Sequence, residues 1–247
     1  MSRIITDTGI WYQNLSHPKY QGMLTCTFIN FYELAHSENM YKKTEKWKQA
    51  LKNLATIPCY AYYTSPIEYI IKGDDEACNI AGFNNLIEIH EAFAFALNND
   101  IIGWNENIKE WLSDRNKIYY DSARYMEKLI VESRRKAKAN HLLLDGYSIA
   151  DSIPLFREKF CDAFLSNHYH KIDINKIDWN EFELLERAGT QFFYEMETSN
   201  LGWQVNDFYD LCNLIYVSPR DHYYVKEKKW IELIKRAGMS KYLFPAL

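Results

Sequence analysis

The sequence has little glycine and little proline. Nine glycines and six prolines are spread over 247 residues, and they form no Pro- or Gly-rich linker. Internal repeats and low-complexity tracts are also absent. Domain boundaries usually fall in linkers of such composition, and an apolar share of 47% is enough to bury one sizeable core. We therefore expect residues 1–247 to form a single domain.

Long apolar runs are missing as well. A membrane-spanning helix needs a stretch of about eighteen or more apolar residues with few or no charges, and the chain contains none. Its first residues show no basic segment followed by an apolar one and a small-residue cleavage site, as a secretory signal would. These two absences predict a soluble, unexported protein of the cytoplasm that has no membrane partner.

The five cysteines occur singly, and no two of them form a CxxC pair. An odd number of scattered cysteines in a chain of this size gives little support to a disulfide framework or a zinc site. Reduced thiols, buried in a cytoplasmic protein, fit the pattern best.

A basic excess is lacking too. The formal net charge is −4, which argues against non-specific nucleic-acid binding by the whole surface but leaves a local basic patch open. The densest run of cations is RRKAK at residues 134–138, and it also fits a solvated helix end that interacts favourably with the helix dipole. The candidate nucleic-acid contacts are Arg134, Arg135, Lys136, Lys138, Lys226 and Lys228.

Most of the sequence has helical periodicity. Amphipathic patterns predict helices over residues 42–55, 66–71, 84–97, 105–138, 149–167, 179–197, 205–216 and 230–237. The pattern at 105–138 fits one helix or two, Pro154 is expected to interrupt the helix around it, and Gly238 is expected to cap the last helix. We therefore predict that the middle of the chain, from about residue 75 to about residue 203, is a large all-helical insertion.

Acidic residues follow two short strand-like segments near the start of the chain. The run RIIT at residues 3–6 predicts a buried strand that ends at Asp7, although an Asp two residues before a Gly is also ordinary turn chemistry. Residues 23–28 are partly extended, and Asn30 is expected to cap a helix that carries Glu33 in an Asn-x-x-Glu capping box. Ligands collect at the carboxyl ends of strands in open α/β sheets, so both acids are candidate site residues.

Two further acids stand together in VNDFYDLCNLIY, residues 205–216. Asp207 and Asp210 are three residues apart, so both project from one face of the predicted helix. Acids in a first helical turn serve as caps that oppose the helix dipole, and they are equally good ligands for a hard cation. Glu227 follows the predicted strand at 222–225, as Asp7 follows the first strand.

Three or four carboxylates at one sheet edge cannot all stay ionised without a counter-charge. Mg²⁺ or Mn²⁺, bound through oxygen atoms and several waters, is the usual solution. Such an ion activates water for attack on a phosphodiester. The acids at element ends are Asp7, Glu33, Asp207, Asp210 and Glu227, with Asp221 nearby.

Four segments carry these acids, and they lie within residues 1–70 and 204–245. They are IITDTGIW (4–11), FINFYEL (28–34), NDFYDL with LIY (206–211 and 214–216) and YVKEKKW (224–230). In this order they resemble the first strand, second-acid segment, third-acid helix and last strand of the PIN-domain family of metal-dependent nucleases. The family commonly has Thr-x-Asp or Thr-Asp in the last motif, where this chain has Lys226 and Glu227.

This resemblance implies an α/β fold with a small central parallel sheet of four or five strands flanked by helices. It also implies one or two Mg²⁺ or Mn²⁺ ions on Asp7, Glu33 and Asp207 or Asp210, with Glu227 reaching the site through its longer arm. The implied reaction is hydrolysis of single-stranded RNA by a metal-activated water. Candidate protein partners are an antitoxin that blocks the acidic pocket, as for small toxins of this family, and a second copy of the chain.

Two alternatives remain. In one, the chain is a PIN-like module with weakened catalysis that binds nucleic acid or a protein. In the other, it is a helical interaction protein whose acids are only caps and surface charges. The discriminating observation is whether Asp7, Glu33 and the Asp207/Asp210 pair meet in space.

Overall fold

A computed structural model describes residues 2–13, 15, 24–72, 80–99, 104–139, 149–168, 173–199 and 201–245. Within helices, it places the backbone but not the side chains of residues 72, 80–87, 136–139, 149 and 164–168. All structural statements below concern the described residues.

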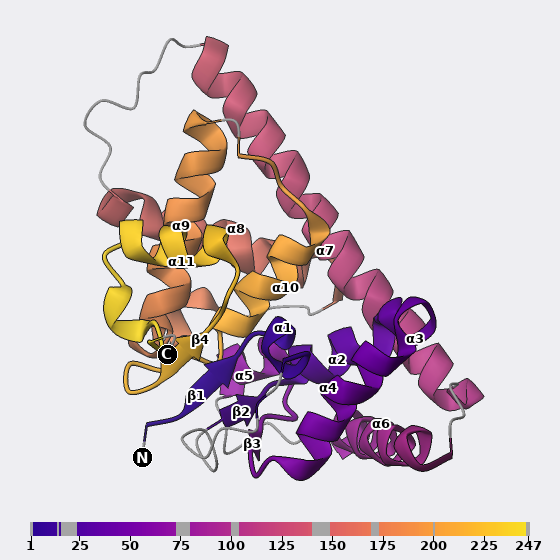
Figure 1. Cartoon of the computed structure of the whole chain (residues 1–247). Coiled ribbons are helices and arrows are strands. Elements are labelled where there is room, and N and C mark those ends of the chain that lie inside the picture. The colour runs from indigo at the N-terminus through magenta and orange to yellow at the C-terminus, as the bar shows by residue number, and fades with distance from the viewer. Residues whose placement is uncertain are drawn as a thin grey trace.

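A four-stranded parallel sheet lies at the centre of the fold (Figure 1). Its strands are β1 (Ile4–Thr6), β2 (Leu24–Cys26), β3 (Tyr60–Ala61) and β4 (His222–Tyr224), in the order β3-β2-β1-β4. Ile5 of β1 pairs with Thr25 of β2 on one side and with Tyr223 of β4 on the other. The two chain ends therefore supply neighbouring strands, and their carboxyl ends face the same edge.

Helices surround this sheet and connect its strands. The short helix α1 (Thr8–Trp11) follows β1, whereas α2 (Phe28–His36), α3 (Asn39–Lys42) and α4 (Thr44–Thr56) connect β2 to β3. Helix α5 (Pro66–Lys72) follows β3, with Ser65 at its start as predicted: the Ser65 hydroxyl donates to the Glu68 carboxylate at 2.5 Å. The expected α/β fold with a small parallel sheet and flanking helices is confirmed at this level.

The start of α2 differs from the prediction. The helix begins at Phe28, and its N-cap is Thr27, whose hydroxyl accepts from the backbone N–H of Asn30. The side chain of Asn30 accepts in turn from the Thr27 N–H at 2.9 Å. Asn30 is thus the third residue of a capping box, and Glu33 lies in the second turn without a capping role.

Four long helices make up the middle of the chain: α6 (Ile80–Asn99), α7 (Glu106–Ala139), α8 (Ile149–His168) and α9 (Glu183–Thr198). Two short 3₁₀ helices, η2 (Ile174–Lys176) and η3 (Trp179–Phe182), precede α9. The pattern at 105–138 forms one continuous helix, α7. The expected interruption at Pro154 is wrong, since α8 runs through it. Pro154 is the sixth residue of α8, just beyond the first turn, so the helix continues without the one hydrogen bond that an N–H at this position would donate to the carbonyl of residue 150.

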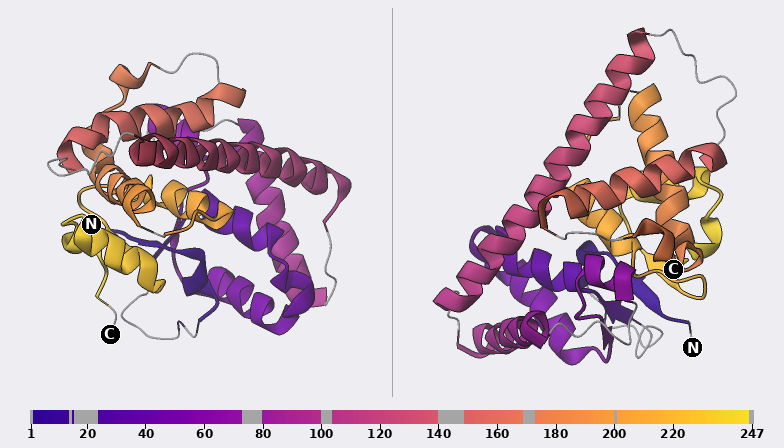
Figure 2. Two further views of the ribbon diagram at one scale, coloured as in Figure 1. Left: turned by 90° about the horizontal axis from the view of Figure 1, so that it is seen from above. Right: turned by 180° about the vertical axis from the view of Figure 1, so that it is seen from behind.

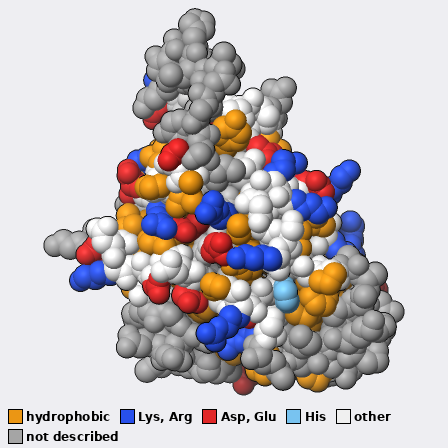
Figure 3. Space-filling model, turned by 90° about the vertical axis from the view of Figure 1, so that its left-hand side faces the viewer, with side chains coloured by type: hydrophobic (Ala, Val, Ile, Leu, Met, Phe, Trp, Pro, Cys, Tyr) orange, Lys and Arg blue, Asp and Glu red, His pale blue; other side chains and the backbone are white. Residues whose placement is uncertain are grey.

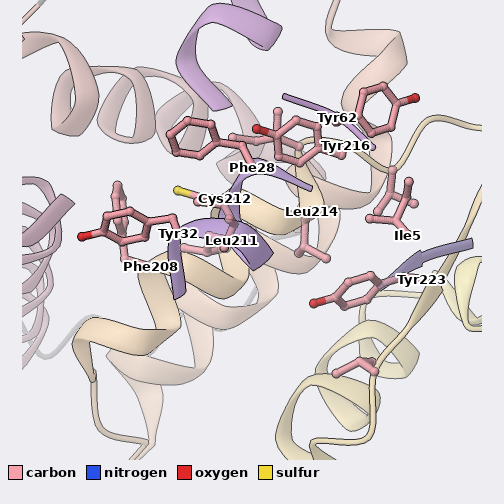
Figure 4. Close-up of a cluster of buried hydrophobic side chains, with 14 of the residues drawn as sticks. Ile5, Phe28, Tyr32, Tyr62, Phe208, Leu211, Cys212, Leu214, Tyr216 and Tyr223 are labelled. Atoms are coloured by element: carbon pink, nitrogen blue, oxygen red, sulfur yellow. The ribbon is translucent and has the colours of Figure 1, made fainter. Parts of the chain in front are cut away.

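The middle helices share their core with the sheet. Buried side chains of β1, α2, α7, α9 and α10 belong to one continuous hydrophobic cluster, part of which is shown in Figure 4. Figures 1 and 2 show α7, α8 and α9 grouped on one side of the fold, where α7 and α9 contact α10 (Val205–Leu214) and α9 contacts α11 (Lys228–Arg236). These helices therefore support the elements that carry the C-terminal acids.

The end of α11 is capped as predicted. Gly238 has φ +75°, a left-handed conformation in which glycine has no steric penalty. Its N–H donates to the Lys235 carbonyl at 3.0 Å, and the Met239 N–H donates to Ile234 at 2.9 Å. These two bonds are those of a Schellman motif. A short 3₁₀ helix, η4 (Ser240–Tyr242), follows.

The surface of the described residues carries both signs of charge. Figure 3 shows Lys and Arg side chains intermixed with Asp and Glu over one face of the molecule. Among the helices of the described part of the chain, none has both the length and the apolar character needed to cross a membrane.

The contact between α8 and α9 gives a test of this packing. A Cβ atom at Gly189 would lie 2.3 Å from Cζ of Phe156, and Phe156 is held by Phe160 and Phe193. We predict that Gly189→Ala lowers the free energy of unfolding by roughly 1–2 kcal/mol, because the overpacking outweighs the gain of alanine over glycine inside a helix. Chemical denaturation measures this change.

Gly202→Ala is the matched control, since nothing lies within 4 Å of a Cβ at that position. It should change the free energy of unfolding by no more than about 0.5 kcal/mol. A Gly189→Ala protein that is as stable as the wild type, or more so, would contradict the close packing of α8 on α9.

Candidate functional site

A cleft of about 590 Å³ opens at the carboxyl edge of the sheet. It is bordered by the segment after β1, helix α2, helix α10 and the junction between β4 and α11. Its lining combines an acidic group, an aromatic group and several amide and hydroxyl side chains. The lining residues are Asp7, Thr8, Gly9, Tyr12, Tyr32, Glu33, His36, Ser37, Glu38, Asn39, Asn116, Asn206, Tyr209, Asp210 and Glu227.

Asp7 enters the cleft from the end of β1. Its backbone N–H donates to the Tyr224 carbonyl at 3.0 Å, which extends the β1–β4 pairing by one residue. A Cβ at Gly9 would lie 2.9 Å from Oδ2 of Asp7, so glycine leaves room for this carboxylate. Burial and, next, the nearby Glu227 raise the pKa of Asp7 to about 6, although the backbone N–H groups of Gly9 and Thr8 oppose the shift.

Glu33 reaches the cleft from the second turn of α2. Oε2 accepts a hydrogen bond from the Thr8 hydroxyl, and the side-chain amide of Asn30 donates both to that hydroxyl, at 2.9 Å, and to the Thr6 carbonyl, at 3.0 Å. Asn30 is buried and fastens the start of α2 to the end of β1. Burial and the charge of Asp7 raise the pKa of Glu33 to about 8, in spite of the bond from Thr8.

Asp210 faces the same cleft from α10. Oδ2 accepts from the indole N–H of Trp230 in α11 at 2.6 Å. The Trp230 ring is fully buried and packs against Phe192 of α9, with ring centroids 5.2 Å apart. Burial, followed by the charges of Asp7, Glu33 and Glu227, raises the pKa of Asp210 well above its usual value.

Glu227 completes the acidic group from the junction of β4 and α11. It occupies the N-cap position of α11, and its side chain is 51% exposed. Oε1 lies 3.8 Å from Nζ of Lys229. Glu227 is thus the most solvated of the four acids, yet it is close enough to raise the pKa of Asp7.

Asp7, Glu33 and Asp210 lack a cationic neighbour among the described residues of the cleft lining. Each charged residue that shifts the pKa of Asp7, Glu33 or Asp210 is another carboxylate, and the described lining contains no Lys or Arg. Among the described residues, however, no three His, Cys, Asp or Glu side chains are arranged to hold a metal ion. The acids are close enough to repel one another, but in this arrangement they do not form a closed ligand set.

Asp207 lies outside the cleft, in contrast to its predicted place in the site. The side chain is only 2% exposed and pairs with Lys229. Its Oδ2 accepts from the Gln204 backbone N–H at 2.8 Å, which caps the start of α10. Of the two acids that share the helix face, Asp207 is thus a capping and ion-pairing residue, and only Asp210 lines the cleft.

Asp221 also has a structural role at a distance from the cleft. Its carboxylate accepts from the Arg3 backbone N–H and from the Ser218 hydroxyl, both at 2.8 Å. It precedes β4, so it lies at the amino end of the strand, opposite the edge that carries Asp7.

The predicted basic contacts are spread over the molecule. The Arg134 guanidinium donates to the carbonyls of Met196 and Leu201, so it joins α7 to the end of α9 and is not free for phosphate. Arg135 is exposed on α7. The side chains of Lys136 and Lys138 lie outside the described residues. Lys226 and Lys228 are exposed beside the cleft, where Lys226 donates to the Gln13 side chain.

The second wall of the cleft was not predicted from the sequence. The Tyr32 hydroxyl bonds to the Asn116 side chain at 3.3 Å, and its ring lies against those of His36 and Tyr209, with centroids 4.7 and 5.7 Å away. Asn116 belongs to α7, so the long middle helices contribute directly to the cleft. Helical spacing relates Tyr32 to His36, but no pattern in the sequence relates either residue to Asn116.

Comparison of the chain with protein-family models, with curated proteins and with solved structures found no match in any of the three.

The two acids of α10 make a matched test of these roles. We predict that Asp210→Asn raises the melting temperature of the metal-free protein, because it removes a repelled charge and keeps an oxygen for the Trp230 N–H. Asp207→Asn should instead lower the free energy of unfolding by roughly 1–3 kcal/mol, because Lys229 loses a buried partner. Thermal and chemical denaturation without metal would contradict this assignment if the two variants shifted stability in the same direction.

Stability should also depend on pH in a defined direction. The pKa values of Asp7 and Glu33 are raised in the folded state to about 6 and about 8, so the folded protein holds more protons than the unfolded chain between about pH 4 and pH 8. We predict that the metal-free protein is most stable near the lower end of this window and loses roughly 1–3 kcal/mol from these groups as the pH rises through it.

Denaturant melts between pH 5 and 8.5 measure this slope, and Glu33→Gln should flatten it. A wild-type slope of opposite sign, or one that Glu33→Gln leaves unchanged, would argue against the repulsion among these acids.

Proposed function

We propose that this protein is a PIN-like, metal-dependent ribonuclease that hydrolyses phosphodiester bonds of single-stranded RNA. The observation that carries the proposal is the convergence of Asp7, Glu33, Asp210 and Glu227 on one cleft whose described lining contains no Lys or Arg. Carboxylates in this situation repel one another unless a cation joins them. The order of the strands and acids is also compatible with the family pattern that the sequence resembles.

The chemistry of the donors fits Mg²⁺ or Mn²⁺. All four acids offer carboxylate oxygens, which such hard cations prefer, and the described part of the lining has no cysteine that would favour a softer metal. Mg²⁺ usually keeps several waters and is held by one or two carboxylates. A cation held by Asp7 and Asp210 would thus not require the closed ligand set that the described residues lack. Bound there, it would supply an activated water and neutralise phosphate charge.

The neighbouring side chains orient the acids. The Thr8 hydroxyl donates to one oxygen of Glu33, and the Trp230 indole donates to one oxygen of Asp210. The second oxygen of each carboxylate is left for the cleft. Such partners fix the direction of a ligand and favour its charged form. Asn30 holds Thr8 in place. Asp7, Glu33, Asp210 and Glu227 form what we call the acidic wall of the cleft, and β1, α2 and α11 support it.

The cleft has a consequence for substrate binding. Apart from His36 and the tyrosines, the ionisable side chains of the described lining are all acids. An RNA phosphate is therefore repelled in the absence of a divalent cation. Metal should therefore be required for binding as well as for cleavage. The exposed His36 ring and the partly exposed Tyr209 ring fit the stacking of unpaired bases, which is how single-stranded RNA is commonly held.

A second candidate is a PIN-like module with weakened catalysis that binds nucleic acid or a protein. Two observations favour it: Glu227 is half-exposed and paired with Lys229, and no three acids are arranged as a closed metal site in the described residues. This candidate predicts RNA or protein binding without cleavage, and the same assays separate it from the first.

Cleavage assays test the proposal directly. With Mn²⁺ and a single-stranded RNA, we predict that Asp7→Asn and Asp210→Asn lose at least 100-fold in cleavage rate while they keep the wild-type circular dichroism spectrum. Loss of one ligand carboxylate removes charge that positions the metal and the attacking water.

Glu232→Gln is a matched control, because this exposed acid pairs with Lys235 on α11 and should leave the rate unchanged. Equal rates for Asp7→Asn and wild type would reject the ribonuclease proposal. Metal-dependent RNA binding without cleavage in the wild type would favour the second candidate.

A further inference from the structure

Tyr223 lies in the middle of β4, beneath the acidic wall of the cleft. It pairs with Ile5 in the central strand β1, and it is fully buried. Figure 4 shows its hydroxyl pointing away from the strand toward the helix that carries Leu211 and Leu214, which is α10. The next residue, Tyr224, accepts the hydrogen bond from the Asp7 backbone, so the site is only one residue away along the strand.

The hydroxyl of Tyr223 has no hydrogen-bond partner among the described residues. An unpaired buried hydroxyl is costly, whereas a phenylalanine ring could fill the same space without that cost. Other buried tyrosines of this protein are paired: the Tyr216 hydroxyl donates to the Thr64 carbonyl and that of Tyr242 to Glu183, both at 2.6 Å. Tyr223 therefore differs from them by an unused donor.

This donor points toward α10, the helix that carries Asp210. Apart from burial, the influences that raise the pKa of Tyr223 are the charges of Asp7, Asp210, Glu33 and Glu227, in decreasing order. Asp7, the strongest of the four, has its Oδ2 turned toward Gly9.

We propose that Tyr223 is a positioning residue of the metal site, whose hydroxyl donates from beneath to the Asp7 carboxylate when a divalent cation is bound. This inference rests on the proposed metal-dependent function. Tyr223 is not part of the cleft lining and cannot touch RNA, so it acts through Asp7. Partners of this kind fix ligand orientation, and their loss typically weakens metal binding 10- to 100-fold.

Mn²⁺ titration of the whole protein tests the proposal through binding rather than cleavage. For Tyr223→Phe, we expect the Mn²⁺ dissociation constant to rise about tenfold. The melting temperature without metal should stay the same or increase, because the variant removes an unpaired buried hydroxyl. In an Asp7→Asn background, Tyr223→Phe should have no further effect on Mn²⁺ binding.

Tyr216→Phe is the matched control, because Tyr216 is equally buried but has a paired hydroxyl. It should lower the melting temperature without metal and leave the Mn²⁺ dissociation constant unchanged. Mn²⁺ binding by Tyr223→Phe with wild-type affinity would overturn the positioning role and leave the proposed function intact. Absence of Mn²⁺ binding by the wild type would instead overturn both.

Discussion

Mutual repulsion among buried carboxylates is the constraint on which the structure of this site depends. Asp7, Glu33 and Asp210 have raised pKa values because burial and neighbouring acids disfavour their charged forms. The surrounding fold must be stable enough to hold them together, since each contributes unfavourably at neutral pH. The continuous core that joins the sheet to the middle helices provides that stability. A divalent cation would convert the same repulsion into binding free energy.

The parallel sheet explains why residues from both chain ends meet. Because β1 lies between β2 and β4, Asp7 and the β4–α11 junction come to one edge, and α2 starts at that edge after β2. The hydrogen bonds of Asn30 to Thr6 and Thr8 then set the direction in which Glu33 leaves α2. Trp230 does the same for Asp210. The acids are thus oriented by buried polar groups and one indole that join different elements.

The sequence predicted the strands and most helices because their apolar periodicity is strong. It singled out Asp7, Glu33 and Asp210 as acids at element ends, but in the structure only Asp7 lies at such an end, whereas Glu33 and Asp210 lie in the second turns of α2 and α10. It could not separate Asp210 from Asp207, since both project from one helix face, and only the position of Lys229 across the fold assigns Asp207 to an ion pair. The start of α2 was misplaced because two capping patterns overlap, and Thr27 with Asn30 prevails over Asn30 with Glu33. Asn116 was missed because its contact with Tyr32 joins residues 84 positions apart.

The middle helices therefore contribute to the candidate site as well as to the core. Helix α7 brings Asn116 to the wall of the cleft formed by the rings of Tyr32, His36 and Tyr209. Helix α9 supports Trp230 through Phe192. The acidic wall, in contrast, is built almost entirely by elements from the two chain ends. In the proposed function, the cation would be held by the chain ends and the RNA bases by a wall that the middle helices complete. Changes in the middle helices should then alter which RNA is bound before they alter metal binding.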